Sequence, residues 1–162
     1  RFCVSIGVEY SGSRRVGVVY DPLLDELFYA VHGAGAWLGQ RRLAVSTTAA
    51  LGEALVATGF AYDVHESQDD NLARFARVLK AARGIRRDGS AALDLCYVAA
   101  GRLDAYWEFK LHAWDVVAGC LIVEEAGGCV SNILGGPVPP AGDEIVATNA
   151  LLHAAILAQM KT

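Results

Sequence analysis

The carboxylate Asp115 is the residue whose type and place in the chain most clearly suggest chemistry. It stands at the start of a predicted helix whose core positions recur at helical spacing (Ala118, Leu121, Ile122 and Glu125) and which ends at the paired glycines Gly127-Gly128. The positive end of a helix dipole stabilises an acid in this place. Two interpretations of Asp115 are therefore open: a capping acid, and a metal ligand held rigidly at the mouth of a cleft.

The residues around Asp115 also resemble a known signature. Trp114-Asp115, Ala118-Gly119 and the closing Glu125-Ala126-Gly127-Gly128 are similar to the second signature of the inositol monophosphatase family of Mg-dependent, Li-sensitive phosphomonoesterases. Further agreement follows in chain order at Val4-Ser5-Ile6-Gly7, Gly17-Val18-Val19-Tyr20, Gly89-Ser90-Ala91-Ala92-Leu93-Asp94 and Gly101-Arg102-Leu103-Asp104-Ala105-Tyr106-Trp107-Glu108. The resemblance implies an α/β (α+β layered) fold, the family's α-β-α-β-α sandwich, here as the later part of the first sheet plus the C-terminal α/β layers.

The resemblance implies roles for five residues of this chain. Asp115 matches an Asp that binds the second metal and contacts the substrate hydroxyl beside the phosphate. Glu108 matches a Glu that hydrogen-bonds polyol hydroxyls, although by itself it reads as a surface acid at a strand end. Gly89, Ser90 and Ala91 match a helix opening whose backbone and hydroxyl face the substrate, and the free N–H groups of a helix start give that place a physical reason.

Hydrolysis of a phosphate monoester requires neutralised phosphate charge and an activated water, and carboxylates that hold Mg²⁺ meet both needs. The family's first signature, Asp-Pro-x-Asp-Gly-Thr, and an upstream Glu supply most metal ligands, and neither is present here. By order, that signature would lie immediately before Arg1. Asp21 and Asp25 resemble it only superficially and are interpreted as turn residues. We therefore expect a fragment of a longer protein that shows little or no phosphatase activity when made alone.

The function implied for the full-length parent is that of an enzyme, an inositol-1-monophosphatase that hydrolyses a small polyol phosphate by attack of a Mg-activated water. Histidinol-phosphate, fructose-bisphosphate and adenosine-bisphosphate phosphatases of the same family are alternatives. A non-catalytic scaffold or regulatory protein that retains the fold is an alternative from another class. The resemblance also implies a homodimer and a small-molecule phosphate substrate.

The amino-acid composition argues against several other classes of protein. Hydrophobic residues make up 54% of the 162 residues and charged residues 20%, which indicates a folded domain. The net charge of −4 argues against a nucleic-acid partner, and no apolar run approaches the ~20 residues that span a bilayer. The four cysteines form no Cys-x-x-Cys pair and are interpreted as reduced core residues. The expected location is the cytoplasm.

Periodicity and turn signals predict where the elements lie. The predicted strands are 2–10, 15–20, 26–31, 54–60, 85–87, 103–109, 128–133 and 144–147, and the predicted helices are 66–83, 91–100, the Asp115 helix and 151–160. Residues 1–50 are predicted to be the remnant of an N-terminal sheet domain and residues 51–162 a C-terminal α/β domain. The first helix is expected to bury a stripe of four residues (Leu72, Phe75, Leu79 and Ala82), and Ser90 to cap the second.

Other residues have weaker signals. His112 could line the cleft, Arg86 and Arg87 could contact substrate or a partner subunit, and Asp94 is expected to brace a neighbouring loop. A turn role is predicted for Asp104, and a packing role for the two tryptophans Trp107 and Trp114.

Overall fold

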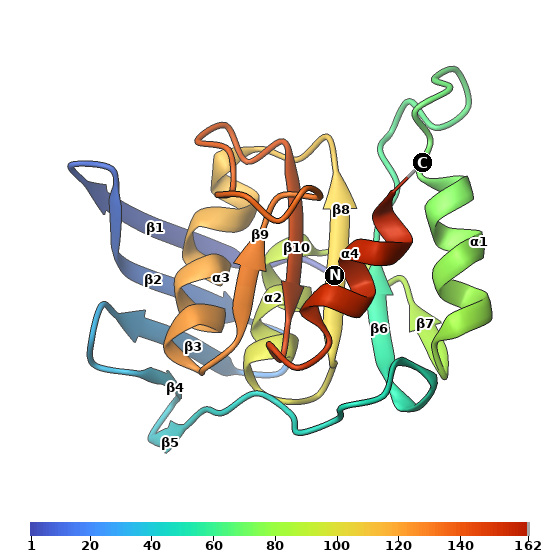
Figure 1. The fold of residues 1–162 in the computed structure, drawn as a ribbon. Coiled ribbons are helices and arrows are strands. Elements are labelled where there is room, and N and C mark those ends of the chain that lie inside the picture. Colours follow the sequence, from blue (N-terminus) through green and yellow to red (C-terminus); the bar gives the residue numbers. More distant parts are fainter. Residues whose placement is uncertain (162) are drawn as a thin grey trace.

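The first of two sheets is an antiparallel meander. The computed structural model describes residues 1–161, and Figure 1 shows their fold. The strands β1 (Val4–Tyr10), β2 (Ser13–Asp21), β3 (Glu26–Val31), β4 (Ala36–Leu38) and β5 (Arg41–Arg42) lie side by side in chain order. The strands predicted within residues 2–31 are therefore confirmed. Asp21 and Asp25 lie at the β2–β3 turn, where Asp21 Oδ1 accepts the Leu23 N–H at 2.9 Å, so their interpretation as turn residues is confirmed.

The second sheet is mixed and has the strand order β7-β6-β8-β10-β9. Its strands are β6 (Leu55–Thr58), β7 (Gly84–Arg86), β8 (Ala105–Phe109), β9 (Cys129–Ser131) and β10 (Glu144–Thr148). The strand β6 pairs in parallel with β7 and β8, whereas β10 pairs antiparallel with β8 and β9. The carboxyl ends of β6, β7 and β8 consequently meet at one edge of this sheet.

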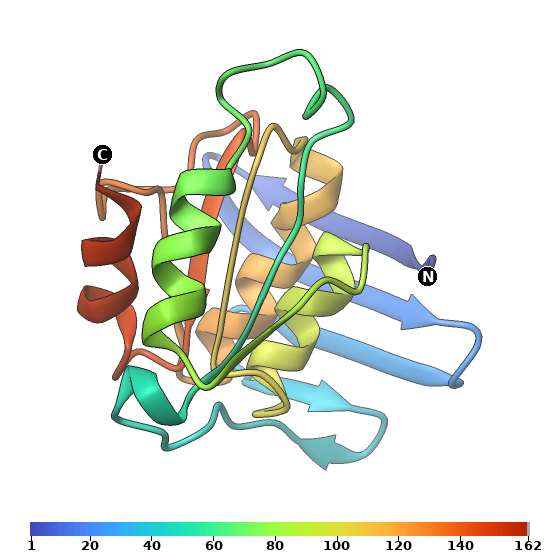
Figure 2. The same ribbon diagram turned by 90° about the vertical axis from the view of Figure 1, so that its right-hand side faces the viewer.

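Helices separate the two sheets and cover the outer face of the second. Helices α2 (Ala91–Ala99) and α3 (Ala113–Glu125) lie between the sheets, and α1 (Leu72–Ala81) and α4 (His153–Met160) lie on the far side of the second sheet (Figures 1 and 2). Side chains on a strand alternate between its faces, so Tyr106 of β8 packs in the core around α2 and α3, and Trp107 packs with α1 and α4. A short 3-10 turn (Leu51–Glu53) precedes β6.

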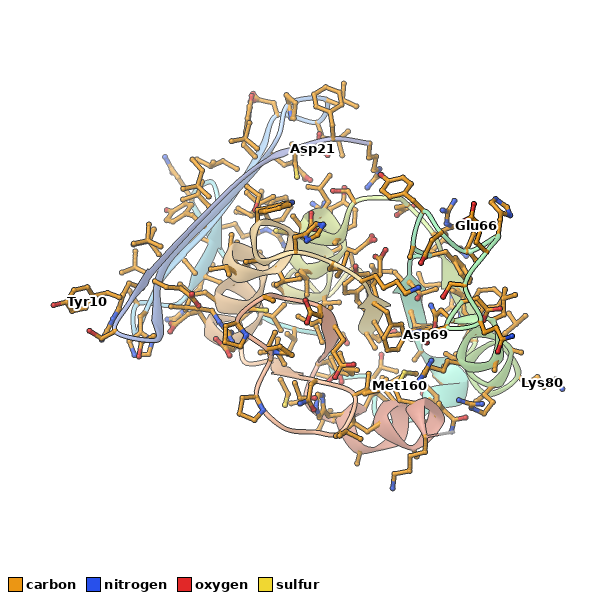
Figure 3. The ribbon with its side chains drawn as sticks, turned by 90° about the horizontal axis from the view of Figure 1, so that it is seen from above. Tyr10, Asp21, Glu66, Asp69, Lys80 and Met160 are labelled. Atoms are coloured by element: carbon orange, nitrogen blue, oxygen red, sulfur yellow. The ribbon has the colours of Figure 1, made fainter. Side chains whose placement is uncertain are left out.

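The α/β layered fold class is confirmed, with one difference in the layers. Residues 1–161 supply a β-α-β-α stack, and the outermost helical layer of the predicted five-layer sandwich has no counterpart among them. The outer face of the first sheet is accordingly apolar and exposed: Val4, Ile6 and Val8 are 53%, 53% and 46% exposed. Figure 3 shows Tyr10 pointing away from the molecule at the end of the same strand. The division at residue 50 stays a prediction, because α3 packs on strands of both sheets.

The predicted helix 66–83 begins later than expected. Helix α1 starts at Leu72, because Asn71 adopts a left-handed conformation (φ 66°) and turns its side chain into the core. There the Asn71 amide donates to Thr58 Oγ1 and the Gly59 carbonyl, both at 3.0 Å, and accepts the Trp107 indole N–H at 2.9 Å. Periodicity cannot reveal this, since a buried polar network sets the boundary.

The predicted buried stripe of this helix was half wrong. Leu72 and Leu79 are 52% and 49% exposed, whereas Val78 is fully buried and Phe75 and Ala82 pack beside it. The helix is rotated so that the stripe at Phe75, Val78 and Ala82 meets the second sheet. In the part of the chain that the structure describes, none of the helices combines the length and apolar character that crossing a bilayer requires.

Glycines bring α3 unusually close to its neighbours. Gly7 of β1 and Gly17 of β2 are paired across the two strands, beneath α3. A Cβ at Gly17 would lie 2.5 Å from the Ala118 carbonyl oxygen, and one at Gly7 would lie 2.4 Å from Val117 Cγ1. On the opposite side, a Cβ at Gly119 would lie 2.6 Å from Leu95 Cβ of α2. The helix that carries Asp115 is therefore held from two sides by contacts that only glycine permits.

The close approach of the Gly17 and Ala118 backbones predicts the effect of a substitution on stability. Gly17→Ala should lower the free energy of unfolding by about 1–3 kcal/mol, because the new methyl group meets backbone that cannot rotate away. Gly84→Ala is the matched control, since its nearest neighbour would be Leu55 Cδ1 at 3.6 Å, an ordinary contact. Urea unfolding of the two variants measures the difference, and equal losses would contradict the proposed close packing.

Candidate active site

A cavity of about 510 Å³ lies where several elements end. It is lined by the start of β1, the loop after β6, the start of α2 and the β8–α3 connection: Cys3, Ser5, Gly59, Phe60, Ala61, Tyr62, Arg87, Gly89, Ser90, Ala91, Ala92, Glu108, Phe109, Lys110, Leu111, His112, Trp114 and Asp115. All five predicted site residues are on its wall. They come from segments that lie up to 26 positions apart in the sequence (Gly89 to Asp115).

The topology explains why these residues meet. Parallel strands bring their carboxyl ends to one edge of a sheet, and ligands of α/β proteins bind at such edges. The strand β7 leads into α2, and β8 leads into α3, so both helices begin beside the same edge. The β6–α1 loop closes another side and rises above the helices in Figure 2. Lys110, at the end of β8, ties this loop down through Asp63 Oδ2 at 2.7 Å and Ser67 Oγ at 2.8 Å.

Asp115 caps the start of its helix, as one interpretation of its sequence position predicted, and it also lines the cavity, whereas its role as a metal ligand stays a prediction. Its Oδ2 accepts the backbone N–H of His112 at 2.9 Å, which caps the start of α3. The side chain is half-buried and lines the cavity, and within residues 1–161 no hydrogen bond engages Oδ1. His112 also lines the cavity, and its ring centroid lies 4.4 Å from that of Trp114, with the two ring planes tilted by 34°. One oxygen therefore fixes the carboxylate, while the other is available to a ligand.

The start of α2 forms the opposite wall. Gly89 has φ 84°, a conformation that favours glycine, and it turns the chain from β7 into the helix. Ser90 occupies the N-cap position with extended backbone, but its hydroxyl makes no capping bond and lies 3.7 Å from Cys3 Sγ. The prediction that Ser90 is the N-cap residue is therefore confirmed, although its side chain makes no capping hydrogen bond. The first N–H groups of α2 have no partner within the helix, and such groups bind anions.

Glu108 is not the surface acid that its position at a strand end suggested. It is half-buried, and its Oε2 accepts the hydroxyl of the fully buried Tyr106. Burial raises the pKa of Glu108, and the charge of Asp115 acts in the same direction. The Tyr106 hydrogen bond and the charge of Arg87 oppose that increase. Two acids therefore face one cavity, and positive charge stands at its rim on Arg87 and Lys110.

A third acid lies behind the cavity wall. Asp94 is 1% exposed, and its Oδ1 has no hydrogen-bond partner among the described residues. Burial, reinforced by the charges of Asp88 and Glu108, raises the pKa of Asp94 to about 8. The expectation that Asp94 braces a loop was therefore wrong. Asp104 has that role instead, since it accepts the Ser46 hydroxyl at 2.6 Å and the Leu55 N–H at 2.7 Å.

Sequence reasoning missed several lining residues. Gly59 and Tyr62 follow β6 and line the cavity because β6 ends beside β8. The signal in the sequence that could have indicated them was the end of the predicted buried strand. Arg87 lines the cavity, whereas Arg86 Nη1 donates to the carbonyl oxygen of Ile85 at 3.2 Å. The packing role of the tryptophans holds for Trp107, which is fully buried. It was wrong for Trp114, which is 69% exposed at the cavity.

Two side chains that could act as nucleophiles, Ser131 and Cys3, are not placed for that role. His153 Nε2 lies 2.9 Å from Ser131 Oγ, as in a nucleophile–base pair. Ser131 is, however, only 3% exposed, and its hydroxyl donates to the Asn132 carbonyl oxygen at 2.6 Å. Cys3 does line the cavity, but burial raises the pKa of its thiol and disfavours the reactive thiolate. The cavity therefore presents acids and helix amides rather than an activated nucleophile.

Comparison with known proteins agrees with this site. Residues 1–162 match the sequence profile described as the inositol monophosphatase family. The chain therefore belongs to the inositol monophosphatase family, which is a family of phosphatases.

Individual relatives show how much of a full-length protein the chain spans. It is 47% identical to an inositol-1-monophosphatase of Synechocystis sp., over 93% of this chain and 53% of the relative. It is 43% identical to a protein of Escherichia coli named Nus factor SuhB, over 99% of this chain and 60% of that relative. The solved inositol monophosphatase of Anabaena (Nostoc) sp. superposes with a TM-score of 0.96 at 46% identity, covering 99% of this chain and 64% of that one. The chain thus spans about half to three fifths of the two curated relatives.

The buried acid behind the cavity predicts a pH-dependent stability. The pKa of Asp94 rises from its ordinary value of 3.8 to about 8, so the folded state binds more protons than the unfolded state between these values. Stability is then lost as the pH rises from about 4 to 8. Asp94→Asn should remove this loss, so its advantage over the wild type should grow from near zero at about pH 4 to several kcal/mol at about pH 8, at roughly 1.4 kcal/mol per pKa unit.

Unfolding by urea at several pH values measures this difference. Asp143→Asn is the control, because the side chain of Asp143 is exposed. If the Asp94→Asn and wild-type stabilities change in parallel with pH, Asp94 is ionised in the folded protein and the assignment is wrong.

Proposed function

We propose that this chain forms part of a phosphomonoesterase that hydrolyses a small polyol phosphate, with inositol 1-phosphate as its representative substrate. The observation that carries the proposal is that Asp115, Glu108 and the opening of α2 line a single cavity. The family membership and the relative named inositol-1-monophosphatase support it. The activity belongs to a protein longer than the part spanned here, since the curated relatives extend well beyond the matched region.

The donor set fits a magnesium ion in part. Mg²⁺ prefers oxygen ligands and commonly uses one or two protein carboxylates together with substrate phosphate. Asp115 offers the free Oδ1 while its Oδ2 is fixed by the His112 N–H. Within residues 1–161 no group of three or more His, Cys, Asp or Glu side chains could hold an ion. The proposal therefore assigns the further ligands to a segment outside residues 1–162, and bound Mg²⁺ would supply charge neutralisation and an activated water.

The other residues bind and orient the substrate. The N–H groups at the start of α2 donate hydrogen bonds to the phosphate oxygens, and the hydroxyl of Ser90, 3.7 Å from Cys3 Sγ, stands beside them. Glu108, on the facing wall, accepts hydrogen bonds from hydroxyl groups of the leaving alcohol. Lys110 holds the loop after β6 over the cavity, which limits the access of water to the ester.

A regulatory protein that retains the fold is the second candidate function. It is favoured by the relative that is 43% identical and is named Nus factor SuhB. In that case the cavity would be retained without turnover. We also propose a homodimer, as the family resemblance implies, which sedimentation of the longer protein would test.

Asp115 gives the sharpest test of the enzyme hypothesis. In the longer protein, Asp115→Asn should lower kcat/KM for inositol 1-phosphate with Mg²⁺ by about 10²-fold or more, because the variant loses a negatively charged metal ligand. The capping bond from His112 is retained by the amide oxygen, so folding should be preserved. Release of inorganic phosphate measures the rate, and thermal unfolding without metal checks the fold.

Asp143→Asn serves as the control in this assay, since Asp143 is exposed and does not line the cavity. Unchanged turnover by Asp115→Asn would remove the metal-ligand role. A wild-type longer protein without phosphatase activity would favour the regulatory candidate. The 162-residue chain made alone is expected to show little or no turnover.

A further inference from the structure

Glu108 sits in a space that two other residues create for it. The first is Tyr106, two positions earlier on β8 and therefore on the same face of that strand. Tyr106 is fully buried, and its hydroxyl donates to Glu108 Oε2. This is the one hydrogen bond that the structure gives the Tyr106 hydroxyl within residues 1–161. A tyrosine whose polar atom serves only the acid of the cavity has a role beyond filling the core.

The second residue is Gly59, directly after β6. A Cβ on Gly59 would lie 2.0 Å from Glu108 Oε1, 2.2 Å from Cδ and 2.3 Å from Oε2. The Gly59 backbone does not have a positive φ, so the requirement at this position is for space and not for backbone conformation. The carboxylate of Glu108 occupies the volume that any other side chain at residue 59 would fill.

Gly59 cannot easily move away from the carboxylate. Its carbonyl oxygen accepts the Asn71 side-chain amide at 3.0 Å, and the same amide group accepts the Trp107 indole N–H at 2.9 Å. The preceding Thr58 donates its hydroxyl to the Trp107 carbonyl at 2.7 Å. Strands β6 and β8 are thus locked at the level of Glu108, and the distance between Gly59 and the carboxylate is fixed by buried bonds.

These contacts constrain one side of the Glu108 carboxylate. Tyr106 holds Oε2, whereas no hydrogen bond to Oε1 is present in the described part of the chain. A hydrogen bond from a buried hydroxyl stabilises the ionised form, which burial disfavours. Without Tyr106, the half-buried carboxylate would lose the hydrogen bond that the Tyr106 hydroxyl donates and would either rotate or take up a proton.

We propose that Tyr106 and Gly59 are positioning residues that hold Glu108 so that Oε1 accepts a hydroxyl group of the substrate's leaving alcohol. The proposal rests on the function proposed above and extends it to substrate choice. It makes the cavity selective for phosphate esters whose leaving group carries hydroxyl groups near the ester. Esters that lack such hydroxyl groups gain nothing from the placement of Glu108.

The test compares two substrates in the longer protein with Mg²⁺. Inositol 1-phosphate carries hydroxyl groups beside the ester, and p-nitrophenyl phosphate carries none. Tyr106→Phe should raise KM for inositol 1-phosphate by about 10- to 100-fold, the effect of losing a hydrogen bond to a charged group. Its kcat, and both constants for p-nitrophenyl phosphate, should change less than threefold, roughly the scatter expected for a surface change. Tyr97→Phe is the matched control, a buried tyrosine of α2 whose hydroxyl bonds Arg1.

Two further variants separate positioning from loss of structure. Gly59→Ala should show the same substrate-selective increase in KM, whereas Gly52→Ala, whose nearest neighbour would be Ala81 O at 3.9 Å, should not. In a Glu108→Ala background, Tyr106→Phe should have little additional effect on KM, because the carboxylate that Tyr106 holds is absent.

The outcomes distinguish this inference from the proposed function. If the wild type hydrolyses inositol 1-phosphate but Tyr106→Phe and Gly59→Ala affect both substrates equally, or neither, the positioning role is wrong and the function stands. If the effects of Tyr106→Phe and Glu108→Ala are additive, the two residues act independently and the inference fails. If the wild type hydrolyses neither substrate, the proposed function and this inference fall together.

Discussion

The close contact between α3 and its neighbours sets the position of the candidate site. The paired glycines Gly7 and Gly17 leave no side chain between the first sheet and the helix, so the backbone at Ala118 rests on the strands. Gly119 brings the opposite side of the helix against Leu95 of α2. Because Asp115 stands less than one turn before these contacts, a helix that cannot slide also fixes the carboxylate.

The far end of α3 is also anchored to the first sheet and its loops. Glu125 accepts the backbone N–H groups of Gly33 and Gly35 at 2.7 and 2.8 Å, which ties the last turn of the helix to the loop after β3. On the next residue inward, Glu124 pairs with Arg14 of β2 at 2.8 Å. A helix anchored at its centre and at its far end can present an acid with little conformational freedom, which is what a metal ligand or a binding group requires.

The candidate site is assembled from the ends of elements rather than from their middles. The amino ends of α2 and α3 contribute N–H groups and an acid, and the carboxyl ends of β6 and β8 contribute Gly59 and Glu108. The helix ends and the carboxylates favour ligand groups of opposite charge. The helix ends favour an anion, while the two carboxylates favour a cation or a hydroxyl donor. A phosphate ester of a polyol, taken up together with a divalent cation, satisfies both preferences in a single cavity.

The sequence predicted the order and type of most elements, and the five residues that the resemblance marked all line one cavity. It did so because strands and helices alternate with clear turn residues, and because the Trp114-Asp115 signature has fixed spacing. It could not predict what distant contacts decide. The start of α1 is set by the buried amide of Asn71, and the orientation of that helix exposes Leu72 and Leu79. Contacts across strands were likewise invisible: neither spacing nor signature indicates that Gly59 leaves room for Glu108, 49 positions away on an adjacent strand.

A crystal structure of the longer protein with Mn²⁺ in place of Mg²⁺, examined by anomalous scattering, would show most directly whether Asp115 binds the metal. We expect an anomalous peak from a Mn²⁺ ion that is coordinated by Asp115 Oδ1, in the cavity that Glu108 also lines. Asp115 Oδ2 should still accept the His112 N–H. A metal bound elsewhere, or an Asp115 carboxylate with both oxygens engaged by the amides of α3, would contradict the proposed role of this helix.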